Sequence, residues 1–112
     1  MAKRILITTD RLGAGDDELG RVLMRNFVYS LARAERLPAA VMLANEGVRL
    51  ACEGSDVIDD LRLLVEAGVT VRSCGTCLDF LGMKESLAVG VVGTMAELVD
   101  GVTGDDAVVT IA

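Results

Sequence analysis

Residues 71–82, VRSCGTCLDFLG, join the end of a short apolar run to a helical pattern. The run itself, residues 69–73 (VTVRS), follows Gly68 and is rich in β-branched residues, which is typical of a β-strand. Two cysteines, Cys74 and Cys77, lie at the junction. The segment therefore predicts a strand followed directly by a helix, with a C-x-x-C motif where the two meet.

Four further apolar runs predict strands, at residues 4–9, 39–45, 88–92 and 107–111. Helical periodicity separates the five runs, with helices expected at residues 17–36, 56–67, 77–82 and 95–102 and with Asp16 and Ser55 as N-caps of the first two. Strands that alternate with helices predict an α/β fold, in which helices cover both faces of a parallel sheet. The chain has 112 residues and no repeat or linker, so we expect a single domain over residues 1–112.

The composition narrows the class of protein. Hydrophobic residues make up 52% of the chain and only 3% are aromatic, which indicates an aliphatic core and favours a homo-oligomer that hides apolar surface. The formal net charge of −6 argues against nucleic acid as a partner, because phosphate binding needs clustered Lys and Arg. No apolar run approaches the roughly 20 residues of a membrane-spanning helix. We therefore expect a cytoplasmic protein with no membrane partner, in which cysteines are more often reactive or metal-binding than disulfide-bonded.

Sites in parallel α/β sheets form where the strands end at their carboxyl edge. Read in order, the segments after the strands contain Asp10, Asn45, the C-x-x-C and Met95. Asp10 could cap its own loop or face Cys74 across this edge. The C-x-x-C thus falls on the edge where function is expected.

A cysteine at the start of a helix meets free backbone N–H groups, and such positions lower a thiol pKa and favour the nucleophilic thiolate. Gly75 would let the backbone turn sharply, and Thr76 adds a hydroxyl group. The alternative is that Cys74 and Cys77 are small buried residues that fill space. Cys52 lies alone in a polar link, and we interpret it as incidental to the chemistry.

Several other chemistries are disfavoured. Without histidine the chain has no Cys–His dyad and no Cys/His zinc site, and one C-x-x-C supplies only two metal ligands. The G-x-G of residues 12–16 (LGAGD) is followed by further acidic residues that would repel a phosphate, so it predicts a turn and not a dinucleotide loop. We expect no metal and no cofactor within the chain.

Three motifs together, D-x-L-G-x-G-D from Asp10, N-x-G-V from Asn45 and S-C-G-T-C-L-D from Ser73, resemble the DsrE/F-like sulfur-relay family. Within it, the chain is most similar to the C-terminal domain of YedF-type proteins of selenium metabolism. The likeness extends from residue 5 to about residue 99. It implies a three-layer α/β/α sandwich whose five parallel strands are ordered 4-3-2-1-5.

The resemblance also implies a function. Family members form oligomers and pass sulfur between partner proteins as a cysteine persulfide, on a cysteine that matches Cys74 or Cys77. YedF-type proteins carry a TusA-like domain ahead of this one; here it is absent, so a sulfur or selenium donor of that type would be a separate chain. Asp10, Asn45, Gly75, Thr76 and Met95 are then the expected substrate-binding residues.

We therefore expect a sulfurtransferase-like carrier of sulfur or selenium, with Cys74 as the attacking thiolate and with Cys77 either resolving the persulfide or holding the transferred atom. One alternative is a dithiol–disulfide oxidoreductase that uses the same C-x-x-C. Another is a non-catalytic assembly subunit whose cysteines hold a metal at an oligomer interface.

Overall fold

The computed structural model describes residues 2–112, in which five parallel strands form one sheet. The strands are β1 (Lys3–Ile7), β2 (Ala40–Leu43), β3 (Thr70–Cys74), β4 (Val91–Gly93) and β5 (Ala107–Ile111). Their order across the sheet is β4-β3-β2-β1-β5, and every neighbouring pair is parallel. The predicted fold class and strand order are both confirmed.

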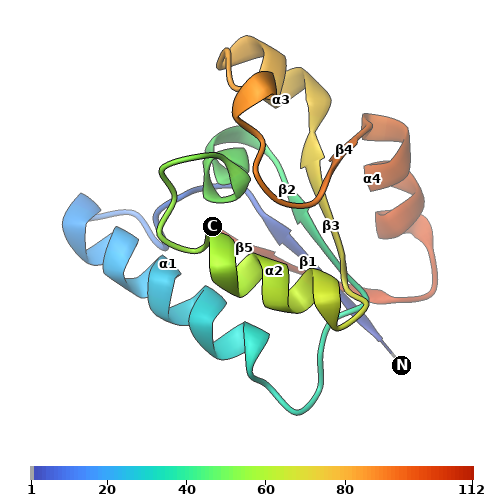
Figure 1. The fold of residues 1–112 in the computed structure, drawn as a ribbon. Helices are drawn as coiled ribbons and strands as arrows, with labels where there is room; N and C mark the ends of the chain where they lie inside the picture. Colours follow the sequence, from blue (N-terminus) through green and yellow to red (C-terminus); the bar gives the residue numbers. More distant parts are fainter. Residues whose placement is uncertain (1) are drawn as a thin grey trace.

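Helices cover the two faces of the sheet unequally (Figure 1). The helices α1 (Asp17–Ala32) and α2 (Ile58–Glu66) lie side by side over one face. On the other face lies α4 (Met95–Thr103), whose Gly101 leaves room for Met42 of β2. The short α3 (Gly75–Phe80) extends beyond the carboxyl end of β3.

The main core lies between the sheet and the α1–α2 layer. The alternation of β1 sends Ile5 and Ile7 into this core, where they join Met24 and Val28 of α1. From α2, Leu61 and Leu64 complete the layer. Aliphatic side chains thus form the core on one face of the sheet, and α4 covers part of the other face.

Several element boundaries differ from the sequence prediction. The α1 helix begins after the predicted N-cap, Asp16, whose carboxylate accepts the N–H of Leu19 at 2.9 Å, but it ends at Ala32 and not at residue 36. Ser55 is not the N-cap of α2: its hydroxyl oxygen accepts the N–H of Val57, one residue before the helix begins.

The segments next to the thiols also differ. Residues 45–51 form an unpredicted 3-10 helix, η1 (Asn45–Ala51), which ends β2 early. A second one, η2 (Lys84–Ser86), precedes β4, which is shorter than predicted. The α3 helix begins at Gly75, two residues before the predicted start. Among the helices of residues 2–112, none combines the length and apolar character needed to span a membrane.

Candidate functional site

Two free thiols lie where β3 passes into α3. Cys74 is the last residue of β3 and the N-cap of α3, and Cys77 is the third residue of that helix. Both side chains are partly buried. The predicted junction of strand, C-x-x-C and helix is therefore present at the carboxyl edge of the sheet.

The segment after β2 supplies a hydrogen bond to one of these thiols. The backbone N–H of Asn45 donates to Cys77 Sγ over 3.1 Å. Asn45 has a φ of 50°, a left-handed conformation that Asn tolerates better than most residues. Gly47 is required close by, because a Cβ there would overlap the carbonyl oxygen of Ile7. The N-x-G pattern thus fixes the backbone that presents the Asn45 amide.

The Cys77 thiol holds its proton more tightly than an ordinary cysteine. Burial raises the pKa of Cys77, and a hydrogen bond with the Cys74 side chain raises this pKa further. The Asn45 amide acts in the opposite direction but is outweighed. At Cys77, desolvation therefore outweighs the lowering of the thiol pKa that a helix start favours. At neutral pH Cys77 is therefore a protonated neighbour of Cys74.

Cys74 also borders a small cavity on the α4 side of the sheet. Its volume is about 20 Å³. Its lining is mostly apolar and includes Leu6, Met42, Met95 and Leu98. A cavity of this size exceeds the roughly 10–15 Å³ that one water-sized group needs, and it is too small for an organic molecule.

A charged pair forms one wall of this cavity, which Arg72 and Glu97 both line. Arg72 lies two residues before Cys74 on β3, so both side chains lie on the same face of the sheet. The stem of Arg72 crosses β4 at Gly93, where a Cβ would come within 3.1 Å of Arg72 Cβ. Beyond Gly93, Arg72 Nε lies 3.2 Å from Glu97 Oε2. Glu97 also accepts the N–H of Thr94 at 2.8 Å and so ties Arg72 to the start of α4.

The structure brings some of the predicted substrate-binding residues to the thiols. Asn45 contacts Cys77, Met95 lines the Cys74 cavity, and Gly75 packs closely on Val92, where a Cβ would lie 3.1 Å from Val92 Cγ1. Thr76 is exposed on α3, next to both cysteines in the chain.

Comparison with known proteins places this chain in a family. The model of the DsrE/DsrF-like family matches residues 25–111. This chain belongs to the DsrE/DsrF-like family. Membership indicates a role related to sulfur relay. No curated protein matches the chain in sequence.

Three solved structures have folds similar to that of this DsrE/DsrF-like chain. The YchN protein of E. coli is 23% identical, with a TM-score of 0.73 over 99% of this chain and 100% of that one. MTH1491 of Methanobacterium thermoautotrophicum, described as of unknown function, is 23% identical, with a TM-score of 0.69 over 98% and 99%. BT1422 of Bacteroides thetaiotaomicron, also of unknown function, is 13% identical, with a TM-score of 0.64 over 97% and 94%.

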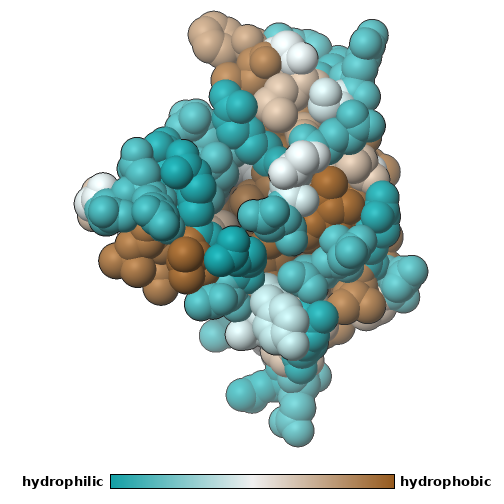
Figure 2. All heavy atoms as spheres, turned by 60° about the vertical axis from the view of Figure 1, so that its left-hand side comes forward, coloured by the Kyte–Doolittle hydropathy of each residue, from teal (hydrophilic) through white to brown (hydrophobic). Residues whose placement is uncertain are grey.

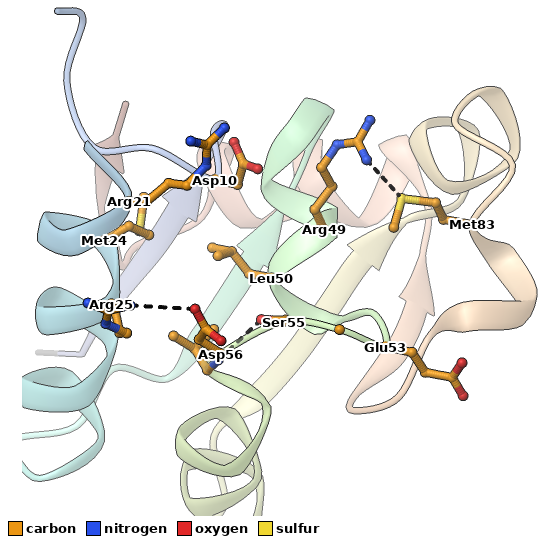
Figure 3. A pocket seen from close by; sticks show the side chains of 12 residues that line it. Asp10, Arg21, Met24, Arg25, Arg49, Leu50, Glu53, Ser55, Asp56 and Met83 are labelled. Carbon is orange, nitrogen blue, oxygen red and sulfur yellow. Dashed lines mark hydrogen bonds and ion pairs between the residues drawn. The ribbon is translucent and has the colours of Figure 1, made fainter. Parts of the chain in front are cut away.

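Asp10 of the DsrE/DsrF-like chain lines a second and larger cleft, of about 290 Å³, shown in Figure 3. Its Oδ1 lies 3.4 Å from Arg11 Nε. Arg25 of α1 forms an ion pair with Asp56 on one side of this cleft, and Arg49 of η1 points towards Met83 on the other (Figure 3). Neither Cys74 nor Cys77 lines this cleft. Asp10 was expected either to cap its own loop or to face Cys74, and the contact that the structure gives it is with Arg11 of its own loop.

Cys52 is placed differently from the prediction. It lies in the core, fully buried, and not in a polar link. Its thiol donates to the carbonyl oxygen of Val48 at 3.3 Å, and burial raises the pKa of Cys52. Among residues 2–112, no three Cys, Asp or Glu side chains are grouped as metal ligands would be.

Two residues of the site were missed from the sequence, Arg72 and Glu97. The signal for Arg72 was available, since residues two apart in a strand point to the same face and Arg72 is two residues from Cys74. The signal for Glu97 was the capping box T-x-x-E that begins α4 at Thr94. The ion pair between them depends on how the Arg72 side chain packs across Gly93 towards α4, which local sequence patterns do not give.

Proposed function

We propose that this protein is a persulfide carrier in which Cys74 takes up the transferred atom. The observation that carries the proposal is the relation between the two thiols: Cys77 holds its proton and hydrogen-bonds the Cys74 side chain, whereas Cys74 opens on a cavity. A protonated neighbour supports a nucleophile by donating to it, and the thiolate is the attacking form of a cysteine.

The loading step is a thiol–persulfide exchange. The Cys74 thiolate attacks the outer sulfur of a donor persulfide, R–S–SH; the new bond is Cys74 Sγ–S, the donor S–S bond breaks, and R–S⁻ leaves. The product is Cys74–S–SH, and no oxidant or reductant is consumed. Cys77, as a thiolate, would then attack Cys74 Sγ and release HS⁻ with formation of a Cys74–Cys77 disulfide, or would take over the outer sulfur.

The experiment is intact-mass spectrometry after incubation with a persulfide donor, R–S–SH, or with a selenopersulfide donor, R–S–SeH. Loading adds about 32 Da for sulfur or about 79 Da for selenium, whereas a disulfide removes about 2 Da. We expect Cys74→Ser to abolish loading, and Cys77→Ser to load and retain the adduct longer. Loading that survives Cys74→Ser and is lost in Cys77→Ser would reverse the two roles. No loading of either thiol would refute the carrier.

The same masses distinguish the carrier from one alternative function, and the metal content distinguishes it from the other. A dithiol–disulfide oxidoreductase is favoured by the adjacency of two free thiols, and it would cycle between the reduced chain and the disulfide without a persulfide. Stoichiometric zinc in the purified protein would favour the assembly subunit with a metal at an oligomer interface.

The proposed carrier acts in the cytoplasm with a donor protein of the TusA-like class, and as a homo-oligomer. Exposed apolar residues support the assembly: Val91 and Val92 on β4 and Val99 and Val102 on α4 are each more than 40% exposed, and Phe80 on α3 is 89% exposed. The face drawn in Figure 2 also carries apolar patches between hydrophilic side chains. A closer relation to YedF-type proteins of selenium metabolism remains part of this proposal.

A further inference from the structure

The cavity beside Cys74 has the size of one atom group. Its volume of about 20 Å³ admits one water-sized group and nothing as large as a cysteine side chain or a small thiol. The atom that a persulfide carrier adds to its cysteine is a single sulfur or selenium. The cavity therefore matches the transferred atom and excludes the donor that delivers it.

The lining of the cavity suits such an atom. Met42 and Met95 contribute thioether side chains, which are polarisable and adapt to irregular spaces, and Leu6 and Leu98 make the remaining walls largely apolar. Leu98 and Met95 come from α4, so this helix forms one wall of the cavity. A water molecule would find few hydrogen-bond partners here.

An ion pair faces the cavity. Arg72 lines it on the same face of β3 as Cys74, and Glu97 at the start of α4 fixes the guanidinium by an ion pair of 3.2 Å. A persulfide ionises more readily than a thiol, so the outer sulfur carries negative charge when it is loaded. Arg72, the positive member of the pair, then attracts this charge, while Glu97, which also lines the cavity, reduces the attraction.

We propose that this cavity, lined by Met42, Met95 and Leu98 and bordered by Arg72, is a subsite for the outer sulfur or selenium of a Cys74 persulfide and shields it from acceptors in solution. The inference rests on the proposed function, because it takes Cys74 as the loaded residue. It adds the place of the transferred atom and a reason for its protection: an acceptor reaches the outer sulfur only when α4 or its contacts are displaced.

The test is the rate at which cyanide removes the outer sulfur. Cyanide attacks that atom and leaves as thiocyanate, which returns the Cys74 thiolate. All variants are made in a Cys77→Ser background, so that Cys77 does not resolve the adduct. Each is loaded with sodium polysulfide, where Cys74–S⁻ takes one sulfur and the polysulfide is shortened by one atom, and peptide mass spectrometry locates the added sulfur.

Two variants alter the cavity and two matched variants do not. Leu98→Ala opens the α4 wall, and its control Val99→Ala removes an exposed side chain from the same helix. Ala44→Val fills the cavity, and its control Ala96→Val adds the same atoms at an exposed position. We expect cyanide to remove the sulfur severalfold faster from Leu98→Ala and from Ala44→Val than from the parent, with both controls unchanged.

Equal rates in all five proteins would overturn the subsite and leave the carrier function intact, whereas a parent that takes up no sulfur on Cys74 would overturn the carrier itself. If one cavity variant does not fold, the other still decides between these outcomes. A faster rate in a control than in its cavity variant would also overturn the subsite, since the shielding would then come from the stability of α4 alone.

Discussion

The backbone N–H of Asn45 donates a hydrogen bond to Cys77 Sγ over 3.1 Å, which joins the end of β2 to the first turn of α3. The donor is a main-chain group, so the identity of the side chain matters only through the left-handed conformation that it permits. This contact opposes the burial that raises the pKa of Cys77.

Asn45→Val should weaken the contact, whereas Asn45→Gly should keep it. A β-branched residue at a φ of 50° costs about 1–2 kcal/mol, and glycine costs little there. Loss of the N–H donor raises the pKa of Cys77 further, so Asn45→Val should slow alkylation of Cys77 at pH 8 relative to Asn45→Gly. Equal alkylation rates in the two variants would show that this amide does not act on the thiol.

Cys77 should titrate above the ordinary cysteine range in the Cys74→Ser variant. Burial, the largest cause of the raised pKa of Cys77, remains after that substitution. Because only the thiolate reacts, the rate of alkylation by iodoacetamide should still be rising above the ordinary thiol value of about pH 8.5. The measurement is a pH–rate profile; a midpoint well below pH 8 would contradict the burial argument.

Cys52→Ser should leave loading of Cys74 unchanged and cost about 1–2 kcal/mol of the free energy of unfolding. The serine hydroxyl can replace the thiol as a donor to Val48 O, but the site is fully buried. Loss of loading in a folded Cys52→Ser protein would give Cys52 a role in transfer.

The effect of Cys52→Ser on the free energy of unfolding should depend on pH. Burial raises the pKa of Cys52 in the folded state, so the unfolded thiol ionises first as the pH rises. The parent thus loses stability above about pH 8.5, while serine does not ionise. The stability difference between parent and variant in urea should narrow from pH 8 to pH 10, and a constant difference would show that Cys52 has an ordinary pKa.

Arg72→Gln should reduce the preference of Cys74 for a negatively charged reagent. Rates with iodoacetate and with neutral iodoacetamide are compared in the Cys77→Ser background, and their ratio reports the local charge. A partly exposed charge is worth roughly 1 kcal/mol, so the ratio should fall by up to about fivefold. Arg62→Gln is the control, since Arg62 pairs with Asp59 on α2; an equal fall in both variants would reflect only net charge.

The protein should assemble at micromolar concentration. The exposed apolar residues of β4 and α4 lie next to each other along the chain, and they would be covered by a second copy. Light scattering should return a mass that is a multiple of 11.8 kDa. A monomer mass at that concentration would contradict the prediction.

The sequence predicted the order of elements and the place of the C-x-x-C because these depend on local patterns. The five apolar runs alternate with helical periodicity, and the strand ends of a parallel sheet share one edge. The 3-10 helix η1 was not predicted, because its conformation depends on the contact of Gly47 with the Ile7 carbonyl on another strand. The raised pKa of Cys77 does not follow from local sequence for a similar reason, since burial outweighs the effect of the local helix start.

The pairing of β5 with β1 sets the order in which this sheet can be completed during synthesis. The first strand made, β1, hydrogen-bonds to β2 on one side and to β5, the last strand, on the other. One edge of β1 therefore stays open until β5 has left the ribosome, while β2, β3 and β4 can already pair. A β5 strand from a neighbouring nascent chain would satisfy the same edge. We thus expect strand-exchanged dimers among refolding products, and a fraction of them that does not rise with protein concentration would argue against this route.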